Sequence, residues 1–168
     1  DEWEGLKLRR DADGQPVVAE PSLGEWLNAP RNKIREQLDK LAYHAHLQQP
    51  RLTGTADIRQ SALIDALYAA SSDPDVRLKR LEEYLRDRAG LLSPQGEGLY
   101  QFPHRSFQEY LAACHLARFD YPDTLSKLAR SDPNHWREVT LLAAARSKAS
   151  PSAICELVDA LCADDDAL

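Results

Sequence analysis

The chain has 168 residues, of which 43% are hydrophobic, and a formal net charge of −6. This length and composition allow one ordinary domain or two small ones with a real hydrophobic core. The acidic balance provides no overall positive field, so we do not expect nucleic acid or an anionic membrane surface as a primary partner. The sequence contains neither an apolar stretch of about 20 residues nor a signal-peptide pattern, which favours a cytoplasmic protein without a membrane span.

Cysteine usage and the chain start also bear on the class of protein. The three cysteines, Cys114, Cys155 and Cys162, lie in helix-like segments without CxxC spacing, which indicates neither a disulfide framework nor a zinc site. We expect them to be small, buried or half-buried apolar residues. Because the chain has no Met and starts at Asp1 in mid-pattern, we also expect it to be a piece of a longer protein.

The first half of the chain predicts helices separated by short extended segments. Residues 1–29 contain a short amphipathic pattern and a polar loop, which we interpret as the end of a preceding helical domain and a linker. Apolar residues at helical spacing then predict a helix from near Pro30 to near Gln48. A short strand over 55–58 and a helix over 61–70 follow.

The next elements complete a winged-helix order. A helix is expected over 76–89, with Gly90 able to adopt the positive φ that ends it. Leu91 and Leu92 start a strand, residues 94–98 form a turn, and residues 99–102 return antiparallel. With one more helix, the order predicts a mainly α protein whose winged-helix domain, with a small two-stranded β wing, spans residues 30–118.

The segment beyond Arg118 has a different composition. Tyr121-Pro122 and Asp132-Pro133 separate three short helical patterns, over 123–130, 134–147 and 152–162. Such helices suit a short superhelical or HEAT-like domain, which we place at residues 119–168.

The segment from Leu99 to Arg118 is the most informative stretch. Ser106 and Glu109 stand at capping-box spacing, which predicts that a helix begins at Ser106. His104 and Arg105 are then expected just outside the helix, at its positive end. The residues expected on or beside the apolar face of this helix are Phe107, Tyr110, Leu111 and Cys114.

This segment resembles the winged-helix signature of NACHT-type signal-transduction ATPases of the STAND class. The matching residues are Phe102, His104, Phe107, Gln108, Glu109, Tyr110, Leu111, Ala112 and Ala113. The run Arg88-Ala89-Gly90-Leu91-Leu92 and the wing after it are also similar to that family.

The resemblance implies a regulatory region of a nucleotide-gated switch in signalling or antiviral defence. In such a protein the winged helix folds over ADP bound by an upstream nucleotide-binding domain and holds the inactive state, and the histidine at the position of His104 contacts the β-phosphate. ADP or ATP with Mg is then expected in the full-length protein, and a homo-oligomer is expected on activation. The chain itself has no GxxxxGK[ST] loop, so we expect it not to be an enzyme and to hold no cofactor alone.

Simpler interpretations remain open for these residues. His104 at a strand end can merely hydrogen-bond a neighbouring carbonyl, and Arg105 can assist a phosphate or pair with an acid at the surface. His44 and His46 point to different helix faces, so we interpret both as surface or boundary residues and assign no metal site. No catalytic residue is assigned.

A winged-helix DNA-binding transcriptional regulator is the alternative function. Winged helices of that class bind DNA through a recognition helix and a basic wing. The wing of this chain contains Glu97 and neither Lys nor Arg, which disfavours that alternative.

Overall fold

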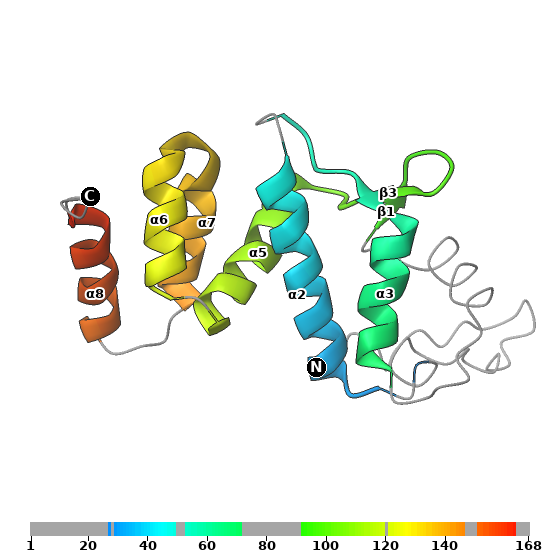
Figure 1. Cartoon of the computed structure of the whole chain (residues 1–168), viewed down its shortest axis with the longest axis horizontal. Helices are drawn as coiled ribbons and strands as arrows, with labels where there is room; N and C mark the ends of the chain where they lie inside the picture. Colours follow the sequence, from blue (N-terminus) through cyan, green and yellow to red (C-terminus); the bar gives the residue numbers. More distant parts are fainter. Residues whose placement is uncertain are drawn as a thin grey trace, which may run out of the picture.

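Figure 1 shows a computed structural model of the chain, which describes residues 27, 29–49, 53–71, 92–119, 121–146 and 151–163. These residues form a mainly helical structure with a small three-stranded antiparallel sheet, which confirms the predicted fold class. The expected helix over 76–89 and the expected domain end within residues 1–26 lie outside the described residues.

The first described elements are helix α2 (Arg31–Gln48), strand β1 (Ile58–Arg59) and helix α3 (Gln60–Ala70). The backbone N–H groups of Lys33 and Ile34 bond to the carbonyl of Pro30, so α2 begins where the sequence predicts. Strand β1 comes three residues later than expected. Residues at helical spacing bury one face of α2, namely Ile34, Leu38, Leu41, Ala42 and Ala45.

The wing consists of strands β2 (Ser93–Pro94) and β3 (Leu99–Gln101). Gly96 and Gly98 have positive φ angles of 111° and 70°, which lets the tight connection reverse the chain. Strand β1 pairs with the free side of β3, so the sheet has the order β1-β3-β2 instead of being the two-stranded wing that the sequence predicts. Strand β2 begins two residues after the expected start.

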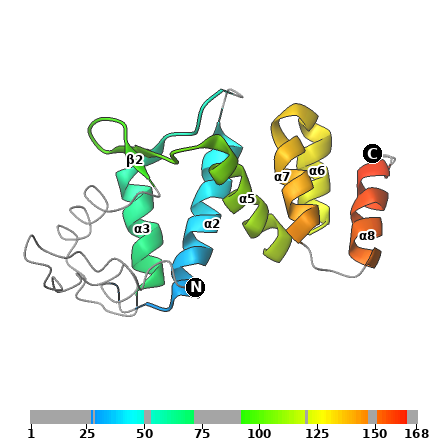
Figure 2. The same ribbon diagram turned by 180° about the vertical axis from the view of Figure 1, so that it is seen from behind.

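Four helices follow, α5 (Arg105–Phe119), α6 (Asp123–Ser131), α7 (Pro133–Arg146) and α8 (Pro151–Cys162), within about a residue of their predicted bounds. Asp132 caps α7, because its carboxylate accepts a hydrogen bond of 3.0 Å from the backbone N–H of His135. Figures 1 and 2 show α5 crossing α2, with α6 and α7 stacked beyond α5 and α8 at the far end.

Two hydrophobic clusters meet inside α5. The first joins α2, α3 and the sheet and ends at Leu111, while the second begins at Ala112 and joins the second half of α5 to α6, α7 and α8. The C-terminal helices therefore pack directly on a helix that also belongs to the winged-helix core. The domain division at Arg118 stays a prediction.

The three cysteines differ in burial. Cys114 on α5 is buried, as expected, but Cys155 and Cys162 on α8 are exposed, so the expectation for these two is wrong. On the same helix Leu157 is buried in the second hydrophobic cluster.

Candidate functional site: the first turn of helix α5

His104 forms the junction between the wing and α5. Its carbonyl accepts hydrogen bonds from the backbone N–H groups of Phe107, at 3.1 Å, and Gln108, at 3.2 Å, so His104 is the residue from which α5 starts. Its side chain is exposed, and no hydrogen bond joins its imidazole to another residue in the described part of the chain. An exposed imidazole thus stands at a helix N-terminus, where backbone N–H groups and the helix dipole favour an anion.

The predicted capping box is wrong. Because α5 begins at Arg105, Ser106 is an exposed residue inside the first turn and cannot act as the cap. The carboxylate of Glu109 accepts a hydrogen bond of 2.7 Å from Nε of Arg105 instead, an ion pair between residues i and i+4. Of the two interpretations of Arg105, the structure contains the pairing with an acid.

The aromatic and aliphatic residues of the motif hold this turn against the winged-helix core. Phe102 is 2% exposed and packs edge-on against Phe107, with ring centroids 5.9 Å apart. Leu111 is buried in the same cluster, and Phe107 and Tyr110 pack against it while half-buried. The turn that carries His104 is therefore positioned by packing from both sides of the motif.

A buried polar cluster, which we call the histidine joint, lies beneath this turn and consists of His46, His135 and Gln108. Nε2 of His46 lies 3.2 Å from the carbonyl oxygen of His135, and Nε2 of His135 lies 2.8 Å from the carbonyl oxygen of His46. The two rings stack with centroids 4.2 Å apart. His46 is fully buried, so its interpretation as a surface or boundary residue is wrong, whereas His44 is exposed as expected.

Gln108 completes the histidine joint from α5. Its amide nitrogen lies 3.2 Å from Nδ1 of His46 and donates to the side-chain oxygen of Gln49 at 2.9 Å. Its amide oxygen accepts from the backbone N–H of Ala56 at 2.9 Å. Burial and the nearby His135 lower the pKa of His46 to about 4, so this imidazole is neutral at pH 7.

A second polar cluster, the arginine cluster, joins the same three helices and consists of Arg35, Asp39, Arg118, Arg146 and Tyr110. Asp39 is 1% exposed; its Oδ1 accepts from Nε of Arg35 at 2.8 Å. Its Oδ2 has no hydrogen-bond partner among the described residues and lies 3.9 Å from Nη2 of Arg118. Nη1 of Arg146 donates to the hydroxyl of Tyr110 at 2.6 Å, which links α7 to α5.

Opposing effects set the charges in the arginine cluster. Burial raises the pKa of Asp39, and the hydrogen bond from Arg35 and the charge of Arg118 partly offset that rise. Burial acts to lower the pKa of Arg35, but the hydrogen bond and charge of Asp39 outweigh it and raise that pKa above its ordinary value. The carboxylate of Asp39 thus lies near the guanidinium groups of Arg35 and Arg118, which favour its charged form.

Residues 1–116 match a family model described as the winged helix-turn-helix domain C-terminal to NACHT. The chain belongs to this family. Comparison with curated proteins and with solved structures gave no match. His104 therefore belongs to a NACHT-associated winged helix, a domain that follows the nucleotide-binding NACHT domain in the same protein.

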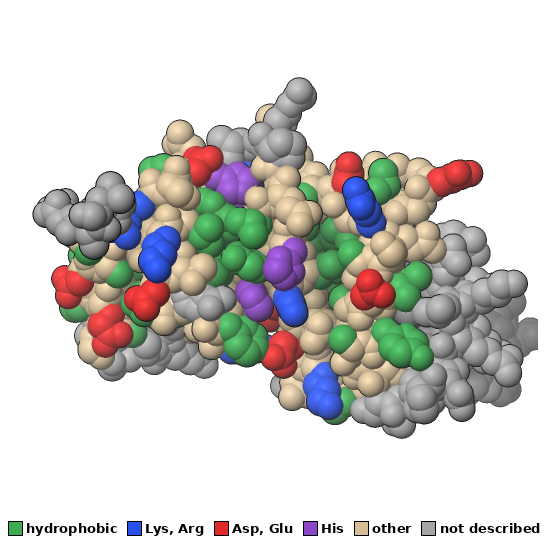
Figure 3. All heavy atoms as spheres, viewed as in Figure 1, with side chains coloured by type: hydrophobic (Ala, Val, Ile, Leu, Met, Phe, Trp, Pro, Cys, Tyr) green, Lys and Arg blue, Asp and Glu red, His purple; other side chains and the backbone are tan. Residues whose placement is uncertain are grey.

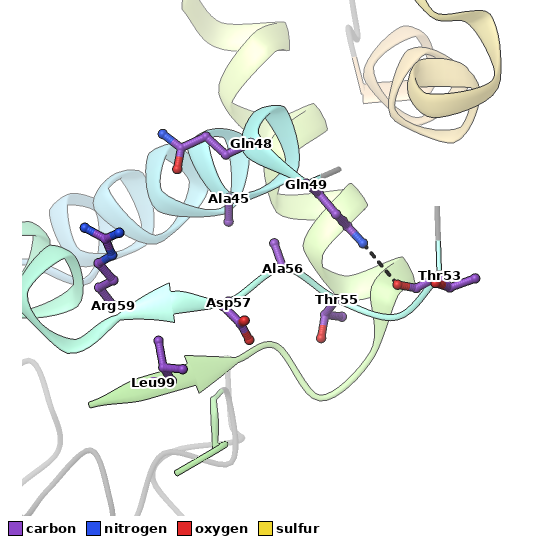
Figure 4. A pocket seen from close by; sticks show the side chains of 9 residues that line it. All are labelled: Ala45, Gln48, Gln49, Thr53, Thr55, Ala56, Asp57, Arg59 and Leu99. Atoms are coloured by element: carbon purple, nitrogen blue, oxygen red, sulfur yellow. Dashed lines mark hydrogen bonds between the residues drawn. The ribbon is translucent and has the colours of Figure 1, made fainter. Parts of the chain in front are cut away.

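A pocket of about 580 Å³ lies beside β1 on the NACHT-associated winged helix (Figure 4). Figure 4 shows the side chain of Gln49 directed to Thr53, whose carbonyl it contacts at 3.4 Å. Asp57 and Arg59 bring opposite charges to the lining, and Asp57 already accepts a hydrogen bond of 2.7 Å from Gln101. The pocket adds no group to the turn that carries His104.

A metal site or a membrane span in the described residues would be a further kind of functional feature. No group of three or more His, Cys, Asp or Glu residues there could hold a metal ion, and no described helix is long and apolar enough to span a membrane. On the face seen in Figure 3 the described Lys and Arg side chains stand among Asp and Glu side chains and form no continuous basic strip.

Sequence reasoning missed two residues of the histidine joint, His46 and His135, and named Gln108 only as part of the motif. A signal was available for His46, because Leu38, Ala42 and His46 follow one another at i, i+4 and i+8 and so share a buried face of α2. For His135 the capping pair Asp132-Pro133 placed the residue in a first helical turn, but nothing in the sequence indicated which helix that turn would face.

Proposed function

We propose that this chain is the regulatory region of a nucleotide-gated NACHT protein, in which the winged helix holds the inactive state by contacting ADP through His104. The observation that carries the proposal is the exposed imidazole of His104 at the N-terminus of α5, within a domain family that follows NACHT. The proposal includes a role in signalling or antiviral defence and assembly into a homo-oligomer on activation.

The residues of this turn fit a phosphate group. An imidazole N–H and the N–H groups of a first helical turn are hydrogen-bond donors, and the helix dipole favours negative charge beside them. Arg105 is paired with Glu109, whereas the imidazole of His104 is exposed and open to an outside group. Arg105 contributes positive charge to the turn in a secondary role.

A contact of this kind produces a switch only through a difference between states. A ligand shifts an equilibrium by its differential affinity for the two conformations, and a bond from His104 that exists only in the closed state supplies such a difference. In the full-length protein ADP or ATP with Mg is bound by the upstream domain, and this chain contributes the closing contact. Loss of that contact favours the open state.

The test is the ADP content of the purified full-length protein. The change His104→Ala removes the donor without touching a buried group, so the fold is retained and ADP retention falls by about 10-fold or more, as expected for a charge-assisted hydrogen bond. The fraction of oligomer measured by light scattering rises in parallel.

The matched control is His44→Ala, which removes an exposed histidine from α2. It should leave ADP content unchanged. If His104→Ala also retains ADP at the level of the unmodified protein, the proposed contact does not exist. The alternative of a DNA-binding regulator predicts a gel shift of duplex DNA at low salt. We expect no shift.

A further inference from the structure

The contact between the winged helix and α7 is made by a reciprocal pair of histidines. Each imidazole donates through Nε2 to the backbone carbonyl of the other residue, His46 to His135 at 3.2 Å and His135 to His46 at 2.8 Å. Both residues are buried, and Trp136 packs edge-on against His46 at 4.9 Å. Two elements that are far apart in sequence are thus joined by directional bonds in addition to apolar packing.

Gln108 connects this pair to the first turn of α5. Its side-chain oxygen accepts from the backbone of Ala56, and its nitrogen faces both Nδ1 of His46 and the amide oxygen of Gln49. Its backbone N–H bonds to the carbonyl of His104 at 3.2 Å. A displacement of this turn therefore displaces the partner of His46.

The bonds require a neutral His46. Nδ1 accepts from Gln108, so the ring proton must reside on Nε2, where it is donated to His135. Among the described residues, the charges of the His135 ring on α7 and of Arg105 on α5 disfavour a positive imidazole at His46, as does burial. The hydrogen bond to the backbone carbonyl of His135 acts in the opposite direction but is outweighed. Protonation of His46 would place one donor against another at Nδ1.

We infer that Gln108, His46 and His135 form a latch that holds the C-terminal helices α6, α7 and α8 on the winged helix while His46 is neutral, and couples their position to the first turn of α5. Gln108 acts in this latch as a positioning residue. The inference concerns the joint between helices and does not require His104 to contact nucleotide, so the two proposals can fail separately.

The latch is tested by the distance between spin labels on α2 and α8 in this chain. Cys155 is exposed on α8 and takes one label, an exposed residue of α2 takes the other through Lys33→Cys, and Cys162→Ser removes the competing thiol. At pH 7.5 we expect one narrow distance distribution. Gln108→Ala lowers the closed-to-open ratio by about 10- to 100-fold, because the buried groups of the joint lose their partner.

The near-isosteric change Gln108→Glu gives the deciding readout. A carboxylate still accepts from Ala56 but cannot donate to His46, so the latch is weakened at pH 7.5. At pH 5.5 a proton shared between the carboxylate and Nδ1 of His46 restores the bond, and the distribution narrows again, whereas Gln108→Ala stays broad at both pH values.

A second variant keeps the test valid if changes at Gln108 prevent folding. His135 lies in the first turn of α7, where Ala is a good helix former. His135→Ala removes the stacked ring and the bond from its Nε2 to the carbonyl of His46, while the carbonyl that accepts from His46 remains. We expect the same broadening at pH 7.5. Narrow, unchanged distributions in His135→Ala and in folded Gln108 variants would overturn the inference.

Discussion

The histidine joint and the arginine cluster join the same three helices, α2, α5 and α7, by opposite means. In the joint, neutral groups are buried and each donor faces an acceptor at 2.8–3.2 Å. In the arginine cluster, a buried carboxylate faces guanidinium groups that are 43% exposed for Arg35 and 45% for Arg118. One oxygen of Asp39 has no hydrogen bond there.

This difference indicates which cluster specifies the geometry. A buried neutral network has strict directional needs, and each unmatched group costs the full desolvation penalty. Half-exposed ion pairs tolerate several arrangements, because water replaces any lost partner. We therefore expect the histidine joint to set the orientation of α7 and the arginine cluster to add a smaller, salt-dependent attraction.

The largest effect is expected from Gln108→Leu. The change keeps the size of the side chain but leaves the N–H of Ala56 and Nδ1 of His46 buried without partners, so the free energy of unfolding should fall by about 3 kcal/mol. Urea denaturation measures this value. The control Gln101→Leu removes a hydrogen bond at an exposed site and should cost less than about 0.5 kcal/mol. An equal loss in both variants would contradict a special role for the buried hydrogen bonds of Gln108.

The pH dependence of stability should reveal His46. Its pKa is about 4 in the folded chain against an ordinary value of 6.5, so the folded state binds fewer protons than the unfolded state below pH 6.5. The contribution of His46 to the free energy of unfolding is fully present above pH 6.5 and is lost as the pH falls. The loss at pH 5 is about 2 kcal/mol. Denaturation at pH 7 and pH 5 measures the loss, which should shrink in His46→Gln and persist in His44→Gln.

Asp39→Asn is expected to have an intermediate effect on the arginine cluster. The amide keeps the shape but leaves the arginines without a counter-charge, which should lower the free energy of unfolding by about 1–2 kcal/mol. The partly exposed guanidinium groups limit the loss, because solvent screens them. Thermal unfolding measures it. A cost as large as that of Gln108→Leu would show that the charged cluster specifies the geometry equally.

The smallest effect is expected for Arg118→Gln. At low salt the change should cost about 0.5 kcal/mol, and the cost should vanish in about 1 M salt, where the Debye length is about 3 Å. The comparison variant Lys33→Gln removes an exposed charge from α2 and should show no cost at either salt concentration. A cost for Arg118→Gln that does not depend on salt would indicate a packing role instead.

Local patterns predicted most of the fold because they act within single elements. Helical spacing and prolines defined the ends of α2, α6, α7 and α8, and Gly96 and Gly98 defined the wing. The same reasoning misplaced the cap of α5, since Ser106 and Glu109 satisfy the capping-box spacing equally well one residue inside the helix. The carbonyl of His104 accepts from the N–H groups of Phe107 and Gln108 and so starts the helix one residue before Ser106.

The features that the sequence did not predict depend on contacts between elements. His46 is buried because α7 supplies a carbonyl and a ring and α5 supplies the amide of Gln108. Strand β1 joins the sheet because the wing returns beside it. At the candidate site, the sequence predicted His104 and Arg105 just outside a helix; this is correct for His104 but wrong for Arg105, which is the first residue of α5. The pairing of Arg105 with Glu109 required the three-dimensional structure.

The division of α5 between two hydrophobic clusters has a practical consequence for choosing expression boundaries. A fragment that stops at Arg118 would leave Ala112, Ala113 and Leu116 facing water and would cut the bonds of His135. Such a fragment should aggregate or self-associate. A winged-helix fragment for biophysical work should therefore extend through Arg146, the end of α7.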